Sequence, residues 1–140
     1  MAVASHLEKS LELNPHPAFL SSSQAFTAYI NPILDFLYTA RPTAVNLGAA
    51  IRRLKNVIAS SVDEGIEVLE LARKVIKEAK EIEAEDVSRN KEMSKLGGEW
   101  LLKESVRRGR SAENLNVMTV CNTGSLATSV CIPDVTFDRC

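Results

Sequence analysis

The segment from residue 61 to residue 83 constrains the fold most, because its apolar and charged residues recur with a helical period. Apolar residues three or four positions apart share one face of a helix, and opposite charges four positions apart line another. The apolar positions are Ile66, Leu69, Ala72, Val75, Ile76 and Ala79, and the charge pairs are Glu70–Lys74, Lys74–Glu78 and Lys77–Glu81. Ser61 and Glu64 match a capping box, so we expect a long helix to begin at Ser61.

Similar patterns predict helices along most of the chain before residue 116. A first short helix is expected to end before the prolines at positions 15 and 17. A second begins after Ser23 and contains Pro32, which predicts a kink or a break. A third follows Pro42, and a further helix is expected from about residue 84 to residue 105. Their expected apolar positions include Phe26, Ile30, Ile33, Leu34, Leu37, Ile51, Leu54, Ile58, Met93, Leu96 and Trp100.

A change of pattern after residue 115 predicts a strand. The short β-branched run from Asn116 to Val120 is typical of a strand that ends in a polar turn. Cys121 follows it directly, at the position where open α/β sheets bind ligands. Gly124 permits a close backbone approach, and Asn122 supplies hydrogen-bond donors and acceptors. The residues alone leave two alternatives: Cys121 is a functional thiol, or it is a small buried hydrophobic residue.

Arg41 is the second candidate site residue. It precedes Pro42, which suits the first position of a helix, so its guanidinium is expected beside unpaired backbone donors. The planar fork of an arginine side chain matches the oxygens of a phosphate group. By chemistry alone, a structural salt bridge and a phosphate contact are equal alternatives for Arg41.

Composition and charge argue against nucleic-acid binding, membrane association and metal binding. The net charge of −1, from 17 basic and 18 acidic residues, gives no electrostatic reason to expect a nucleic-acid partner. No apolar run is long enough to cross a bilayer, and charged residues interrupt the expected signal-peptide region, so we expect no membrane association. The three cysteines form no CxxC pair, so neither a disulfide framework nor a metal site is predicted. The expected location is the cytoplasm, with the nucleus as a second compartment.

Three segments in a fixed order carry a family resemblance. They are Thr39 to Leu47 (TARPTAVNL), Asp86 to Trp100 (DVSRNKEMSKLGGEW) and Cys121 to Thr128 (CNTGSLAT). In these segments the chain resembles the methylthioribose-1-phosphate isomerase family, which is related to the regulatory subunits of the guanine-nucleotide exchange factor of translation initiation. The resemblance covers roughly residues 1–128.

The resemblance implies a mainly α fold. Residues 1–115 are expected to form the helical N-terminal domain of the isomerase family, incomplete at its start. Residues 116–128 would be the first strand and cysteine loop of a truncated Rossmann-like α/β domain. Residues 129–140 are expected to be a divergent tail that does not belong to the family's working protein.

The resemblance also implies a reaction, in which a phosphorylated thiosugar is converted from aldose to ketose without a metal or an organic cofactor. Cys121 would be catalytic, paired with an aspartate from a later half of the family's protein, and Asn122 and Gly124 would support its loop. Arg41 would contact the sugar phosphate. A homodimer is expected for the full-length protein, and little activity for this chain alone.

Two alternatives to this reaction stay open. The chain could be a noncatalytic regulatory or interaction module like the exchange-factor subunits, or part of a ribose-1,5-bisphosphate isomerase. Cys121 favours an enzyme, because a noncatalytic relative would not need a thiol in this loop.

Overall fold

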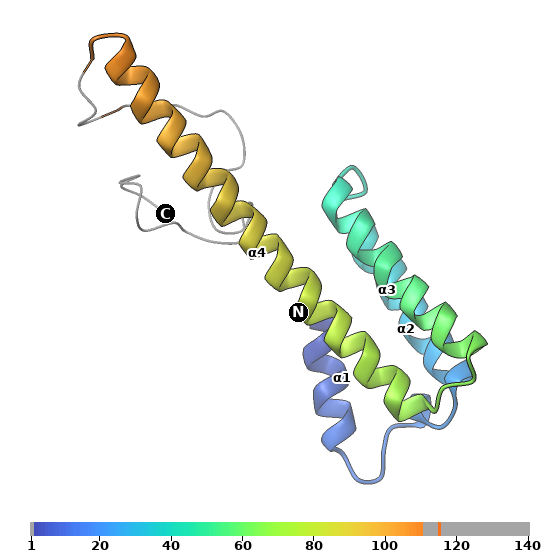
Figure 1. Cartoon of the computed structure of the whole chain (residues 1–140). Helices are drawn as coiled ribbons and strands as arrows, with labels where there is room; N and C mark the ends of the chain where they lie inside the picture. Colours follow the sequence, from blue (N-terminus) through green and yellow to red (C-terminus); the bar gives the residue numbers. More distant parts are fainter. Residues whose placement is uncertain (1, 111–114, 116–140) are drawn as a thin grey trace. The chain divides into compact units, whose positions relative to one another are not determined.

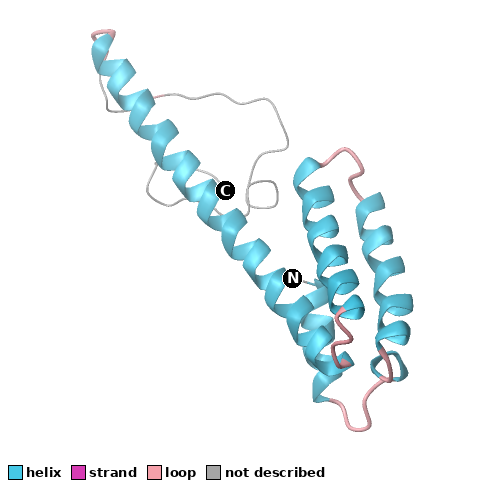
Figure 2. Cartoon of the chain, turned by 45° about the vertical axis from the view of Figure 1, so that its right-hand side comes forward, coloured by secondary structure: helices cyan, strands magenta, loops and turns pink. Residues whose placement is uncertain are grey.

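The computed structural model describes residues 2–110 and residue 115, and these residues are mainly α-helical (Figures 1 and 2). The sequence-based expectation of a mainly α fold is therefore confirmed. The predicted strand at 116–120 and the cysteine loop lie outside the described residues. The described elements are α1 (Ala2–Glu12), the short 3₁₀ helix η1 (Ala18–Leu20), α2 (Ser23–Thr39), α3 (Val45–Asp63) and α4 (Val68–Arg107).

The chain divides into two compact units, Met1–Glu83 and Ala84–Cys140. Within the first unit, α2 and α3 form an antiparallel pair joined by a short turn (Figures 1 and 2). In the second unit, the described residues are the C-terminal part of α4, residues 108–110 and residue 115. The predicted divisions at residues 115/116 and 128/129 remain predictions.

The first unit is built around one apolar core. Side chains from every helix of this unit contribute, and the largest fully buried ones include Phe26, Leu7 and Ile30. Burial of this kind contributes about 25 cal/mol per Å² of apolar surface, which makes it the main stabilising term. The other buried hydrophobic residues are Val3, Ala4, Leu20, Leu34, Ile51, Leu54, Ile58, Val68, Leu71, Ala72, Val75, Ile76 and Ala79. The apolar positions predicted for the helices at 23–39 and 61–83 are therefore largely confirmed as core.

The start of α2 follows its sequence signal, and its interior proline does not end it. The Ser22 hydroxyl accepts a hydrogen bond from the Ala25 N–H at 3.1 Å, which caps the helix. The helix then continues through Pro32 to Thr39, so the alternative of a break is wrong. Pro32 removes one backbone donor, but burial of the neighbouring Ile30 and of Leu34 holds the helix on the core.

The predicted capping box at Ser61 is wrong. Ser61 lies inside α3, and that helix ends in a Schellman motif around Gly65, whose φ is +68°. The Ile66 N–H donates to the Ser61 carbonyl at 3.0 Å, and the Gly65 N–H donates to the Val62 carbonyl at 3.0 Å. A glycine followed by an apolar residue is the signal for this motif. It outweighed the local preference of Ser61 for a helix start.

Glu67 provides the actual start of α4. Its carboxylate accepts hydrogen bonds from the backbone N–H groups of Leu69 at 3.0 Å and Glu70 at 3.2 Å. An acidic side chain at this end of a helix also complements the helix dipole.

The expected division near residue 84 is absent, because α4 is continuous from Val68 to Arg107. Four of the five residues from Glu81 to Glu85 are strong helix formers, and none of the five is glycine or proline. The helix ends in a second Schellman motif, where Gly109 has φ +68° and the Arg110 N–H donates to the Ser105 carbonyl at 3.0 Å.

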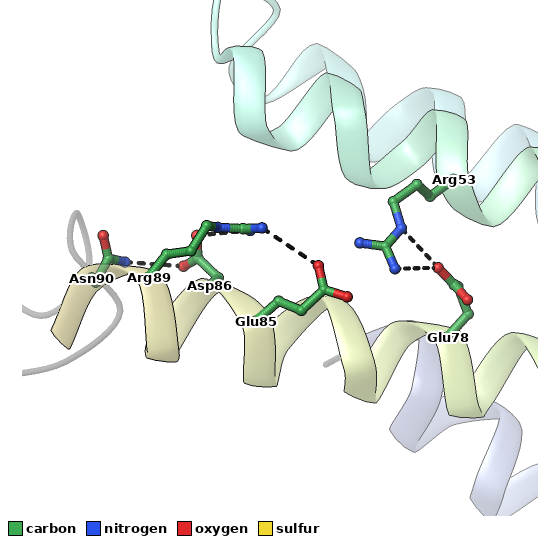
Figure 3. Close-up of polar contacts among 6 residues, drawn as sticks. All are labelled: Arg53, Glu78, Glu85, Asp86, Arg89 and Asn90. Carbon is green, nitrogen blue, oxygen red and sulfur yellow. Dashed lines mark hydrogen bonds and ion pairs between the residues drawn. The ribbon is translucent and has the colours of Figure 1, made fainter. Parts of the chain in front are cut away.

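Tertiary packing redirects the charge pairs of the long helix. Lys77 and Glu81 form the predicted pair, with Nζ and Oε1 3.7 Å apart. Glu78 instead accepts from Arg53 of α3, at 2.8 Å from Nε and 2.7 Å from Nη2 (Figure 3). Lys74 pairs with a carboxylate that precedes α4 rather than with one in it. Helical spacing alone cannot distinguish a pair within one helix from a pair between two.

Candidate functional site

Arg41 lies in the turn that joins α2 to α3, and its side chain is exposed. The Arg41 N–H donates to the Tyr38 carbonyl at 3.3 Å, which continues the last turn of α2. The Ala44 N–H donates to the Arg41 carbonyl at 2.9 Å, which closes a four-residue turn from Arg41 to Ala44. The backbone of Arg41 is thus tied to both sides of the connection while its guanidinium reaches solvent.

Pro42 does not occupy the first position of a helix, contrary to the expectation from sequence. The helix α3 begins at Val45, and Ala44 precedes it in an extended conformation with φ −78° and ψ 105°. Pro42 is the second residue of the turn closed by Ala44, a position for which the fixed φ of proline is equally well suited. The turn, and not the start of α3, therefore uses the fixed φ of Pro42.

Arg41 forms no ion pair within the described part of the chain. None of the described carboxylates forms an ion pair with its guanidinium, and the first turn of α3 has no acidic residue. No side chain caps α3, so its first N–H groups lack the partner that a serine or aspartate would provide. The structural salt bridge that remained open for Arg41 is not formed by the residues that the structure describes.

Two further residues shape this turn, and sequence reasoning missed both. The Tyr38 hydroxyl donates to the Pro42 carbonyl at 2.8 Å. A Cβ atom added to Gly48 would lie 3.3 Å from Cε2 of the Tyr38 ring and 3.3 Å from Nη1 of Arg52. In the sequence, the one indication of this contact is that Gly48 lies early in a predicted helix, ten positions after Tyr38.

The remaining predicted site residues lie outside the described residues. They are Cys121, Asn122 and Gly124, so the cysteine loop stays a prediction. Among the residues that the structure describes, no three His, Cys, Asp or Glu side chains are grouped to hold a metal ion. No described helix combines the length and apolar character needed to cross a membrane.

The fold and this turn define a helical domain that presents, between two antiparallel helices, an arginine with no ion-pair partner among the described residues. The chain belongs to the Initiation factor 2 subunit family, which matches residues 3–135. The family resemblance carried by the three sequence segments is confirmed. The match continues past Thr128 into the segment that was predicted to be a divergent tail.

Three of the similar curated proteins carry the same name. The chain is 52% identical over 129 residues to the methylthioribose-1-phosphate isomerase of Postia placenta, which covers 92% of the chain and 33% of that protein. It is 48% identical over 130 residues to that of Laccaria bicolor, with 92% and 34% covered, and 33% identical over 129 residues to that of Vitis vinifera, with 92% and 33% covered. The chain therefore spans about a third of the length of these relatives. No solved structure matches it.

Proposed function

We propose that this chain supplies the phosphate-binding turn and the cysteine loop of an aldose–ketose isomerase. The proposed reaction converts methylthioribose-1-phosphate to methylthioribulose-1-phosphate in methionine salvage. The names of the relatives motivate the choice of substrate. The observation that carries the proposal is the exposed Arg41, which has no carboxylate partner in the described residues.

Arg41 is the proposed ligand of the sugar phosphate. A guanidinium donates two parallel hydrogen bonds to phosphate oxygens, and these charge-assisted bonds are stronger than neutral ones. The first turn of α3 begins at Val45 without a side-chain cap, so its dipole adds a favourable field for an anion. The absence of acidic residues from that turn removes the main source of repulsion.

Cys121 is the proposed catalytic group, supported by Asn122 and Gly124 in the same loop. Aldose–ketose isomerisation oxidises C2 of the sugar and reduces C1, so one hydrogen moves between neighbouring carbons and no external oxidant is needed. The enzyme therefore has to hold and move a proton or hydride within a protected pocket. A thiol beside the reacting carbons can exchange a proton with the substrate oxygen as the hydrogen moves.

The activity is proposed for the protein in which this segment works with the rest of the family's sequence. Catalysis needs groups positioned on both sides of the reacting carbons, and the matched region is about a third of the relatives. We therefore expect little turnover from the 140-residue chain alone. A homodimer and a cytoplasmic location belong to the same proposal.

A hybrid protein tests the proposal. The matched 129-residue segment of the Postia placenta relative is replaced by the corresponding part of this chain, and formation of the ketose is measured. Arg41→Ala is expected to lower kcat/KM by about a hundredfold, because each hydrogen bond to a charged group contributes about 1.5–3 kcal/mol. Cys121→Ser is expected to lower kcat by orders of magnitude.

The control is Arg73→Ala, which removes an exposed arginine of α4 that lies outside the proposed site. It should leave kcat/KM unchanged, and circular dichroism should show the same helicity for all variants. Full turnover in both Arg41→Ala and Cys121→Ser would refute the assignment of these residues. Ribose-1,5-bisphosphate as a second substrate would separate the two candidate isomerases.

The family's description favours a second candidate function, that of a noncatalytic subunit of an initiation-factor assembly. The hybrid distinguishes the two, because a regulatory module would not make turnover depend on Cys121. Turnover that is lost in Cys121→Ser supports the isomerase.

A further inference from the structure

Tyr38 connects the end of α2 to the turn that contains Arg41. Its hydroxyl donates to the Pro42 carbonyl at 2.8 Å, and its ring lies against the α3 backbone at Gly48. A Cβ atom at position 48 would stand only 3.3 Å from the ring, closer than side chains normally pack. Glycine at this position therefore provides the space in which the ring reaches Pro42.

The hydrogen bond from Tyr38 also sets the direction of the next backbone donor. The peptide bond between Pro42 and Thr43 is trans, so its N–H points opposite to its C=O. Because the carbonyl is held by Tyr38, the Thr43 N–H points away from the Tyr38 hydroxyl. That N–H has no acceptor among the described residues, whereas the Arg41 N–H donates to the Tyr38 carbonyl and the Ala44 N–H donates to the Arg41 carbonyl.

We propose that Tyr38 is a positioning residue for the sugar phosphate, and that the Thr43 N–H is a ligand of the phosphate alongside the Arg41 guanidinium. This inference rests on the proposed phosphate role of Arg41. Tyr38 does not touch the substrate. It fixes the peptide plane between Pro42 and Thr43. The Thr43 N–H on one side of Pro42 and the Arg41 guanidinium on the other are therefore ordered before the phosphate binds.

Backbone NMR of the ¹⁵N-labelled chain tests the inference. Methylthioribose-1-phosphate is titrated into the unaltered protein, and the dissociation constant is taken from the amide shifts of Thr43 and Ala44. Methylthioribose without its phosphate is the ligand control and should not change the amide chemical shifts of Thr43 and Ala44. Tyr38→Phe keeps the ring against Gly48 but removes the hydroxyl, and should weaken binding by about threefold, as expected for one modest hydrogen bond.

Tyr29→Phe is the matched protein control. Tyr29 also belongs to α2, is 38% exposed like Tyr38, and uses its hydroxyl in a hydrogen bond with His6 at 3.1 Å. Its removal should not change the dissociation constant. Gly48→Ala displaces the Tyr38 ring by a few tenths of an ångström and should weaken binding by about twofold. In the double variant with Tyr38→Phe, no further loss is expected, because both changes act through one hydrogen bond.

The outcomes separate the two claims. If Arg41→Ala weakens binding while Tyr38→Phe does not, the role of Tyr38 is overturned and the phosphate role of Arg41 stands. If the unaltered chain shows no phosphate-dependent shifts at Thr43 and Ala44, the inference about Tyr38 and the Thr43 N–H is overturned, and Arg41→Ala in the hybrid protein decides separately whether Arg41 binds the phosphate. If Tyr29→Phe and Tyr38→Phe weaken phosphate binding equally, the cause is a general loss of α2 stability, and the positioning role of Tyr38 is overturned.

Discussion

In its first half, α4 directs Leu71, Ala72 and Val75 into the core of the first unit, where each has 0% exposure. In its second half, which belongs to the second unit, Met93, Leu96 and Trp100 are 65%, 56% and 62% exposed. Both halves have apolar residues at helical spacing. The contrast teaches that the spacing predicts the helix but not whether another element covers its apolar face, because coverage depends on residues that are distant in sequence.

The largest effect is expected from a matched pair of leucines in this helix. Leu71→Ala should destabilise the first unit by about 3 kcal/mol, because it removes a fully buried side chain and leaves a cavity. Leu96→Ala should change stability by less than about 0.5 kcal/mol, since more than half of Leu96 is already exposed to water. Urea unfolding followed by circular dichroism measures both. A large loss from Leu96→Ala would mean that the second half of α4 has a covered face.

A pair of glycines gives the next largest effect and examines the second half of α4 by itself. Gly97 lies inside the helix with nothing within 4 Å of an added Cβ, so Gly97→Ala should stabilise the helix locally by up to about 1 kcal/mol. Gly109→Ala should destabilise its end by about 1 kcal/mol, because φ of +68° disfavours a side chain. Amide hydrogen exchange from residue 95 to residue 106 reports both changes. Equal responses at the two glycines would contradict this account.

Ion pairs in the two halves of α4 should differ in the same direction, with smaller effects on stability (Figure 3). Glu78→Gln should destabilise the first unit by about 1 kcal/mol, because the carboxylate is 19% exposed, accepts a hydrogen bond from Nε of Arg53 and forms an ion pair with its Nη2. Arg89→Gln in the second half should cost only about 0.3 kcal/mol, since the ion pair of Arg89 with Glu85 is exposed and lies within one helix. Thermal unfolding at low and high salt checks both, and salt should reduce the smaller effect more completely.

The smallest expected effect concerns pH at the end of α4. Arg107 and Arg108 each donate to the Glu104 carboxylate at 2.7 Å, and these hydrogen bonds hold the pKa of Glu104 below the ordinary value of 4.5. A lowered pKa in the folded state means that the stabilisation is present above about pH 4.5 and is lost as the pH falls through the lower folded value. Carbon-13 NMR of the carboxyl group should show this titration. Arg107→Gln should raise the pKa of Glu104. An unchanged pKa in this variant would show that Arg107 does not lower it.

Sequence predicts most of the helices, because their periodicity is a local property. The second helix was predicted to begin after the serines at 21–23, and α2 begins at Ser23. The capping box at Ser61 failed because a competing signal, Gly65 followed by Ile66, ended α3 later. The pairing of Glu78 with Arg53 could not be read from sequence, since it joins two helices whose faces meet only in the fold.

The candidate site is predictable only in part. Arg41 was found from its chemistry and from the family resemblance of its segment. Its turn geometry was not, because Pro42 suits both a helix start and a turn, and the hydrogen bond from Ala44 decides between them. Tyr38 and Gly48 were missed because their contact depends on how closely α2 and α3 approach each other.

The short turns at residues 40–44 and 64–67 also bear on how quickly the first unit forms. Because each connects two helices that are consecutive in the chain, the contacts next to each turn join residues of small sequence separation. Helical proteins of low contact order fold in microseconds to milliseconds, since little loop-closure entropy is lost before contacts form. We therefore expect the hairpin of α2 and α3 to assemble early, so that the Arg41 turn is already ordered when later parts of the chain meet it.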